Sequence, residues 1–156
     1  MGSCVYKIKF NKSSSFLNNC YEGFSDIEKE KISELGADSY FDYNDDEGYV
    51  CFLITTPLEI SKYFKILSNN YIEYEHIDLS EDILYKRYDL EKELSDKINP
   101  LNSMKWGLFI DDVDIWISEN LHIDLVLDLI SKVGIDNLSR NEKEFLNKYS
   151  KCLNNN

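Results

Sequence analysis

Residues 39–60 read SYFDYNDDEGYVCFLITTPLEI, and they predict two strands, a tight turn and then a helix. Both arms of the hairpin, which we place over residues 38–56, are rich in aromatic and β-branched residues, and NDDEG between them consists of turn formers. The second arm is almost entirely apolar, so we expect it at the centre of a sheet. Thr56 can cap a helix that begins at Pro57 and runs to about Ser68.

Further strands are predicted on both sides of this hairpin. Apolar and basic residues alternate over Cys4–Phe10, which is typical of a strand, and residues 71–79 (YIEYEHIDL) predict another. Between the first strand and the hairpin, Ser25 and Glu28 form a capping box for a short helix that Gly36 would end. The resulting order, β-α-β-β-α-β, is the split β-α-β or ferredoxin-like arrangement of an α+β protein.

The periodicity changes at Ser80. Residues 80–98 carry apolar side chains at helical spacing and predict one long helix ended by Asn99-Pro100. Residues 104–117, MKWGLFIDDVDIWI, are ambiguous: their composition favours a strand or hairpin, and a buried helix fits nearly as well. We therefore expect residues 1–79 to form a sheet subdomain and residues 80–156 a helical extension within one compact domain.

The C-terminal segment predicts two short helices with clear ends. Leu121–Val133 is apolar at helical spacing and is followed by Gly134, and Ser139 with Glu142 forms a second capping box. The second helix is expected to bury Phe145, Leu146 and Tyr149. Because helices this short are marginal alone, we interpret the pair as a docking hairpin, which packs either on this protein's own sheet or on a partner.

Residues 127–150, LDLISKVGIDNLSRNEKEFLNKYS, carry a helix, a glycine, a D-x-L-S turn and an E-x-E-F-L-x-x-x-S helix. The matching residues are Leu129, Ile130, Gly134, Asp136, Leu138, Ser139, Glu142, Glu144, Phe145, Leu146 and Ser150. This pattern resembles a small helical module at the C-termini of some bacterial rhomboid-type membrane proteases. The module has no activity of its own, so the resemblance implies a bacterial origin and not proteolysis.

Charge limits the classes of partner. The chain has 29 acidic and 17 basic side chains and a net charge of −12, which opposes binding to nucleic acid or to an anionic membrane and favours a basic protein partner. Four cysteines, at positions 4, 20, 51 and 152, are widely spaced, and no apolar segment approaches the length of a membrane span. We expect free thiols in a reducing cytoplasm.

Few residues could support catalysis. His76 and His122 are the only histidines, neither lies in a known motif, and Cys51 falls in an apolar strand. No glycine-rich phosphate loop or HExxH motif is present, so we expect no enzyme and no cofactor. Asp42, Asn44 and Asp46 begin like a calcium loop, but the required glycine and terminal glutamate are missing, so we expect no metal there.

Tyrosines alternate with carboxylates in YFDYNDDEGY and YIEYEH, a pattern that suits a surface for a basic protein or simply a well-packed sheet. The predicted partner-binding residues are Tyr40, Asp42, Tyr43, Asp45, Asp46, Glu47, Tyr49, Tyr71, Glu73, Tyr74, Glu75, Asp111, Asp112 and Asp114. The leading hypothesis is an immunity-type inhibitor that occludes a basic toxin or nucleic-acid-acting protein. One alternative is an adaptor that docks through the C-terminal hairpin, and another is a metal-dependent enzyme in which Asp112 and Asp114 hold Mg²⁺. The oligomeric state is left open.

Overall fold

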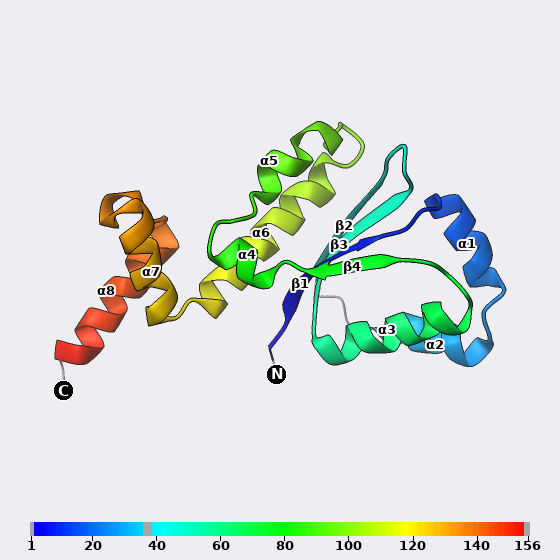
Figure 1. Ribbon diagram of the computed structural model, residues 1–156, viewed down its shortest axis with the longest axis horizontal. Coiled ribbons are helices and arrows are strands. Elements are labelled where there is room, and N and C mark those ends of the chain that lie inside the picture. Colours follow the sequence, from blue (N-terminus) through cyan, green and yellow to red (C-terminus); the bar gives the residue numbers. More distant parts are fainter. Residues whose placement is uncertain (1, 36–38, 155–156) are drawn as a thin grey trace.

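The computed structural model describes residues 2–35 and 39–154, which form an α+β fold around one antiparallel sheet (Figure 1). The strands are β1 (Cys4–Lys9), β2 (Ser39–Asn44), β3 (Tyr49–Thr55) and β4 (Glu75–Asp78). Their order is β2-β3-β1-β4, so β3 lies between the two strands of the split β-α-β unit. The predicted ferredoxin-like arrangement, and the central place of the apolar arm of the hairpin, are confirmed.

Alternation along β1 sends side chains to two different cores. Val5 joins a cluster on one face of the sheet with Phe41 and Phe52, whereas Tyr6 and Ile8 join a cluster on the other. The register that aligns these rows pairs Tyr6 with Leu53 of β3. Because both faces carry buried apolar side chains, helices must cover both faces.

The face that carries Tyr6 and Ile8 is covered by α1 (Ser14–Glu22), α2 (Asp26–Glu34) and α3 (Pro57–Asn69). The capping box of Ser25 with Glu28 and the Thr56 cap are both present, as predicted. Helix α1 has no counterpart in the sequence-based expectation; it begins where Ser13 accepts the backbone N–H of Phe16. The predicted helix stop at Gly36 lies outside the described residues.

The face that carries Val5, Phe41 and Phe52 is covered by α4 (Ser80–Leu84), α5 (Leu90–Leu94), a 3₁₀ turn (Ser95–Lys97) and α6 (Ser103–Asn120). The strand that composition favoured for residues 104–117 is therefore wrong, and the helical alternative is right. Phe109, Val113 and Trp116 recur at helical spacing, and they bury one stripe of α6 in the same cluster as Phe52. This packing outweighs the strand preference of the β-branched and aromatic residues, which depends strongly on context.

The single long helix expected over residues 80–98 is also wrong, because the chain turns between α4 and α5. Lys86 has a φ of 58°, its N–H bonds the carbonyl of Ile83 at 3.2 Å, and the N–H of Arg87 bonds that of Asp82 at 2.8 Å. These two bonds are those of a Schellman helix end, with lysine where glycine is usual. Asp89 then caps the next helix, so two short helices replace one long one.

The C-terminal hairpin consists of α7 (Ile123–Val133), a 3₁₀ turn (Ile135–Asn137) and α8 (Arg140–Asn154), set to one side of the sheet (Figure 1). It has a small core of its own, formed by Leu125, Val126, Leu129 and Leu138. Leu84 and Tyr85 pack against this core, so the hairpin rests on the α4 region of its own chain and not on the sheet. Phe145 and Leu146 pack inward as expected, but Tyr149 is exposed.

Candidate protein-binding surface

Two of the predicted binding segments meet at one end of the sheet. Lys9, at the end of β1, forms an ion pair with Glu47 of the β2–β3 turn and lies opposite Glu75 of β4 in the strand register. The side-chain amide of Asn11 donates a hydrogen bond of 3.1 Å to Glu73. The end of β1 therefore joins residues 45–47 to residues 73–75.

These segments line an open pocket with a volume of about 590 Å³. Its lining residues are Lys9, Phe10, Asn11, Glu47, Ile72, Glu73, Tyr74 and Glu75. The lining thus contains three carboxylates and one ammonium group, and the pocket has a negative charge. We call Asp45, Asp46, Glu47, Glu73, Tyr74 and Glu75 the sheet-end surface.

The turn that positions Glu47 is held by Asp45. Its carboxylate accepts the backbone N–H groups of Glu47 at 2.8 Å and of Gly48 at 3.0 Å, which is an Asx turn. Partial burial opposes ionisation of Asp45, but these two N–H groups, helped by Lys97 and Lys9, lower the pKa of the carboxyl below its usual value. A charged Asp45 is therefore part of the folded turn.

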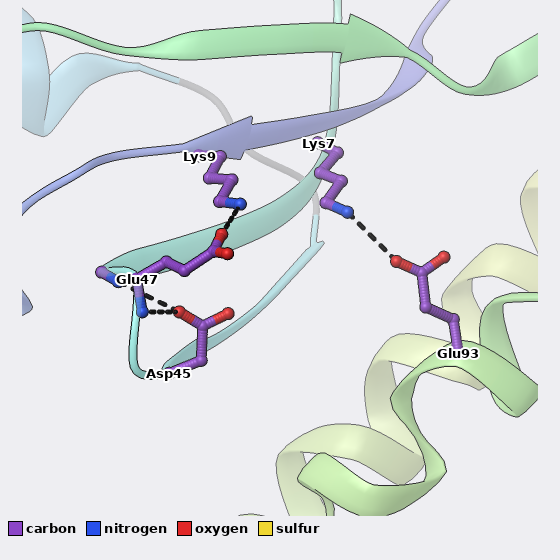
Figure 2. Close-up of polar contacts among 6 residues, drawn as sticks. Lys7, Lys9, Asp45, Glu47 and Glu93 are labelled. Carbon is purple, nitrogen blue, oxygen red and sulfur yellow. Dashed lines mark hydrogen bonds and ion pairs between the residues drawn. The ribbon is translucent and has the colours of Figure 1, made fainter.

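Lysines from β1 organise the carboxylates nearby. Figure 2 shows Lys7 and Lys9 leaving the same side of β1, one toward Glu93 on α5 and the other toward Glu47. The Lys7 ammonium lies 3.1 Å from the Glu93 carboxylate and 5.5 Å from the ring centroid of Phe52. The hydrogen bond to Glu47 raises the pKa of Lys9, and the charges of Glu47, Asp45 and Glu75 add to this effect.

Most of the predicted tyrosines serve the sheet. Tyr49 stacks on Phe10, and its hydroxyl donates to Asp42 at 2.5 Å. Tyr74 stacks on Phe64 with ring centroids 4.8 Å apart, so only part of its ring faces the pocket. Burial, with the nearby charges of Asp45, Glu93 and Asp96, raises the pKa of Tyr43 to about 12. Of the predicted tyrosines, Tyr40 and Tyr71 are the exposed ones.

The three aspartates predicted at 111, 112 and 114 lie on α6, away from the sheet-end surface. Burial, followed by the charges of Glu91 and Asp111, raises the pKa of Asp114. These aspartates therefore belong to a second acidic surface, on a helix and not on a strand.

Lys9 and Asn11 are functional candidates that the sequence reasoning missed. The signal was present in the alternation of Lys7 and Lys9 with apolar residues on β1, which places both lysines on one face. The partner of Asn11 is Glu73, 62 residues further along the chain, and no local pattern shows this contact.

Cys51 and the two histidines do not line this pocket. Burial, together with the charge of Asp42, raises the pKa of the Cys51 thiol to about 12, which leaves it unreactive. His122 caps α7, where its Nδ1 accepts the backbone N–H of Leu125 at 3.3 Å. His76 packs on Phe64, with 4.4 Å between the two ring centroids. Within residues 2–35 and 39–154, no three His, Cys, Asp or Glu side chains form a group that could hold a metal ion.

Comparison with known proteins finds a similarity in the C-terminal part of the chain. Residues 118–152 match the model of a family of unknown function (DUF6576), and this match covers the α7–α8 hairpin and the last turn of α6. No curated protein and no solved structure matches the chain. In the described part of the chain, every helix is too short or too polar to cross a bilayer.

Proposed function

We propose that this chain binds a basic protein partner through the sheet-end surface. The observation that carries the proposal is the meeting of Glu47, Glu73 and Glu75, from two distant segments, around one pocket. The three carboxylates outnumber the single ammonium group of the pocket, so the pocket is negatively charged. The chain as a whole has a net charge of −12. A positively charged partner would be attracted at long range and paired at short range.

The pocket suits an arginine or lysine side chain of the partner. Glu47 is already paired with Lys9, and one oxygen of Glu73 accepts from Asn11, whereas Glu75 is exposed on the edge strand. A guanidinium could pair with Glu73 and Glu75 while its plane packs on Tyr74. Arginine and tyrosine are residues that dominate the energetics of protein interfaces.

In its sharpest form, the proposal describes an immunity-type inhibitor that acts in the bacterial cytoplasm. Carboxylates of the sheet-end surface would take the places of substrate phosphates on a toxin that acts on nucleic acid, and the bound chain would exclude the substrate. This mechanism needs no catalytic group, cofactor or membrane contact on the inhibitor.

The proposal is tested by charge reversal with a matched control. The variant Glu73→Lys/Glu75→Lys changes the pocket, and Glu30→Lys/Glu34→Lys makes the same change in net charge on the exposed face of α2. Each chain is used as bait in a lysate of the source cells, at low and high salt. We expect the wild type and the control to retain a basic protein at low salt, and the pocket variant to lose it. Retention of the same proteins by all three baits would contradict the proposal.

The inhibitor form is tested on the captured protein. Its activity on nucleic acid is measured with increasing amounts of the wild-type chain. We expect inhibition that is complete at one equivalent and is lost with Glu73→Lys/Glu75→Lys. Binding without any inhibition would contradict the inhibitor hypothesis and would show that the chain only binds this protein.

The alternative function of an adaptor is supported by a separate observation. The α7–α8 hairpin has its own core, and the family match is confined to residues 118–152, as expected for a portable docking module. Leu127 is half exposed on α7 and offers a test. Loss of the captured partner in Leu127→Arg, with retention in Glu73→Lys/Glu75→Lys, would favour the adaptor.

A further inference from the structure

Helices α1 and α2 cover the sheet loosely on the face that carries Tyr6 and Ile8. Both helices are described over their full lengths, and neither has a buried side chain. Leu17 of α1 and Ile32 of α2 are only half-buried, and no residue of α2 (Asp26–Glu34) belongs to the apolar cluster on this face. The side chains beneath these two helices are therefore not closely packed, and space remains beside the strands.

Two pockets occupy this space, with volumes of about 380 and 340 Å³. They are neighbours, because Ile32, Tyr49 and Tyr63 line both of them. The lining of the larger pocket also includes Asp42 and Tyr21, and we call it the Asp42 pocket. Its volume and its mostly apolar and aromatic lining are typical of sites for small molecules.

Asp42 brings a negative charge to the pocket. It is half-buried on β2, opposite Cys51 of β3, and one of its carboxylate oxygens accepts the hydroxyl of Tyr49 at 2.5 Å. Within residues 2–35 and 39–154, no lysine or arginine forms an ion pair with Asp42. Nor does any basic side chain of these ranges line either pocket. The carboxylate therefore lies among apolar and aromatic groups without a cation to balance it.

This chemistry selects the class of ligand. An anion would meet a carboxylate and no basic side chain, and the net charge of −12 opposes its approach. A metal ion such as Ca²⁺ needs six or more oxygen ligands, and Asp42 is the one carboxylate that the described residues bring to this pocket. An organic ammonium group, by contrast, can pair with a single carboxylate while its apolar part packs on aromatic rings.

Two tyrosines of the lining suit such a ligand. The ring of Tyr21 already has the Lys29 ammonium 5.8 Å from its centroid, so we assign the ligand to Tyr49 and Tyr63 instead. The hydroxyl of Tyr63 forms no hydrogen bond with any described residue, which leaves it able to accept one from an ammonium group. Carboxylate, hydroxyl and ring are thus offered by one pocket.

We propose that the Asp42 pocket binds a small aromatic amine in its ammonium form. The carboxylate of Asp42 pairs with the ammonium group, and the aromatic ring of the ligand packs against Tyr63 and Ile32. No residue of the sheet-end surface lines this pocket, so the site does not depend on the proposed function.

Three probes that share a phenyl ring test the class of ligand: 2-phenylethylammonium, 2-phenylethanol and phenylacetate. Each is titrated into the full chain to about 10 mM, a range suited to very small ligands, and binding is followed by NMR shifts of the backbone amides. We expect the ammonium probe to bind with a dissociation constant below about 1 mM and to shift the amides of Ile32, Asp42 and Tyr63. The alcohol should bind at least about tenfold more weakly, and phenylacetate should not bind. Absence of binding by the ammonium probe, or equal binding of all three probes, would overturn the proposal.

Two variants with matched controls locate the site. Asp42→Asn removes the charge but keeps an acceptor for Tyr49, and its control, Asp128→Asn, makes the same charge change on the exposed face of α7. Ile32→Trp fills the pocket, and its control, Ile27→Trp, adds the same side chain at a position of α2 that is 66% exposed. We expect Asp42→Asn to weaken binding of the ammonium probe at least about tenfold without affecting the alcohol, and Ile32→Trp to abolish the binding of both. An ammonium probe that binds equally to either variant and its control would overturn the proposal, and the NMR spectrum of each free variant establishes that it is folded.

Discussion

The ammonium of Lys86 lies 2.9 Å from a carboxylate oxygen of Glu142, and this ion pair fastens the C-terminal hairpin to the turn between α4 and α5. Glu142 is 2% exposed, and the same carboxylate accepts the backbone N–H of Ser139 at 2.7 Å. Lys86 adopts a φ of 58°, a conformation that favours glycine. Lysine at this position therefore carries some backbone strain, which the ion pair with Glu142 can offset.

Removing the ammonium should loosen the hairpin. We expect Lys86→Met to lower the free energy of unfolding by about 1–2 kcal/mol, because it leaves a buried carboxylate with one backbone donor. Urea denaturation measures this change. Arg140→Met is the control, since the Arg140–Glu144 pair is exposed and contributes no more than about 0.5 kcal/mol. Equal losses in the two variants would mean that the Lys86–Glu142 pair has no special role.

The Asx turn at Asp45 should make stability depend on pH. Because the folded state lowers the pKa of Asp45, the ionised carboxylate stabilises the fold above the unfolded value of 3.8, and this contribution is lost as the pH falls through the folded pKa. We expect Asp45→Asn to lower the free energy of unfolding by up to about 1 kcal/mol at pH 7, and to leave it unchanged at a pH below the folded pKa. Urea denaturation at pH 7 and in acid measures the two differences. The control is Asp46→Asn in the same turn, which should leave the free energy of unfolding unchanged at either pH. A loss of stability in Asp45→Asn that persists in acid would contradict this role of the ionised carboxylate.

Asp114 should behave in the opposite way. Its pKa is raised by burial and by the charges of Glu91 and Asp111, so its ionised form destabilises the folded state at neutral pH. We expect Asp114→Asn to increase the free energy of unfolding by a few tenths of a kcal/mol at pH 7, a small value because the burial is only partial and most of the side chain is open to solvent. The gain should vanish below the unfolded value of 3.8. Thermal melts at the two pH values check this, with Asp128→Asn on α7 as the control.

Substitutions along α6 should show helical and not alternating periodicity. Phe109 is fully buried, and Phe109→Ala should lower the free energy of unfolding by about 3–5 kcal/mol. Ile115 is 55% exposed, and Ile115→Ala should lower it by less than about 0.5 kcal/mol. In a strand, both side chains would share one face and both substitutions would have similar costs. Chemical denaturation of the two variants therefore distinguishes the two structures directly.

Local chemistry explains the elements that could be predicted. Ser25, Thr56 and Ser139 each accept a backbone N–H three residues ahead, so the starts of α2, α3 and α8 depend on neighbouring residues alone. The β2–β3 hairpin is similar, because the turn and both arms lie within residues 39–55. The ferredoxin-like strand order then follows from the order of the elements and from the apolar character of the central arm.

The sequence by itself thus determined the strands, most of the helix starts and the acidic character of the surface. Tertiary structure decided that residues 103–120 are helical, because the sheet offers Phe109 and Trp116 an apolar face that a strand could not use equally well. It also decided the break at Lys86, whose side chain meets Glu142 56 residues later, and the sheet-end pocket, where Asn11 meets Glu73. These features depend on contacts between distant segments, and such contacts leave no periodic trace in the residues near either partner.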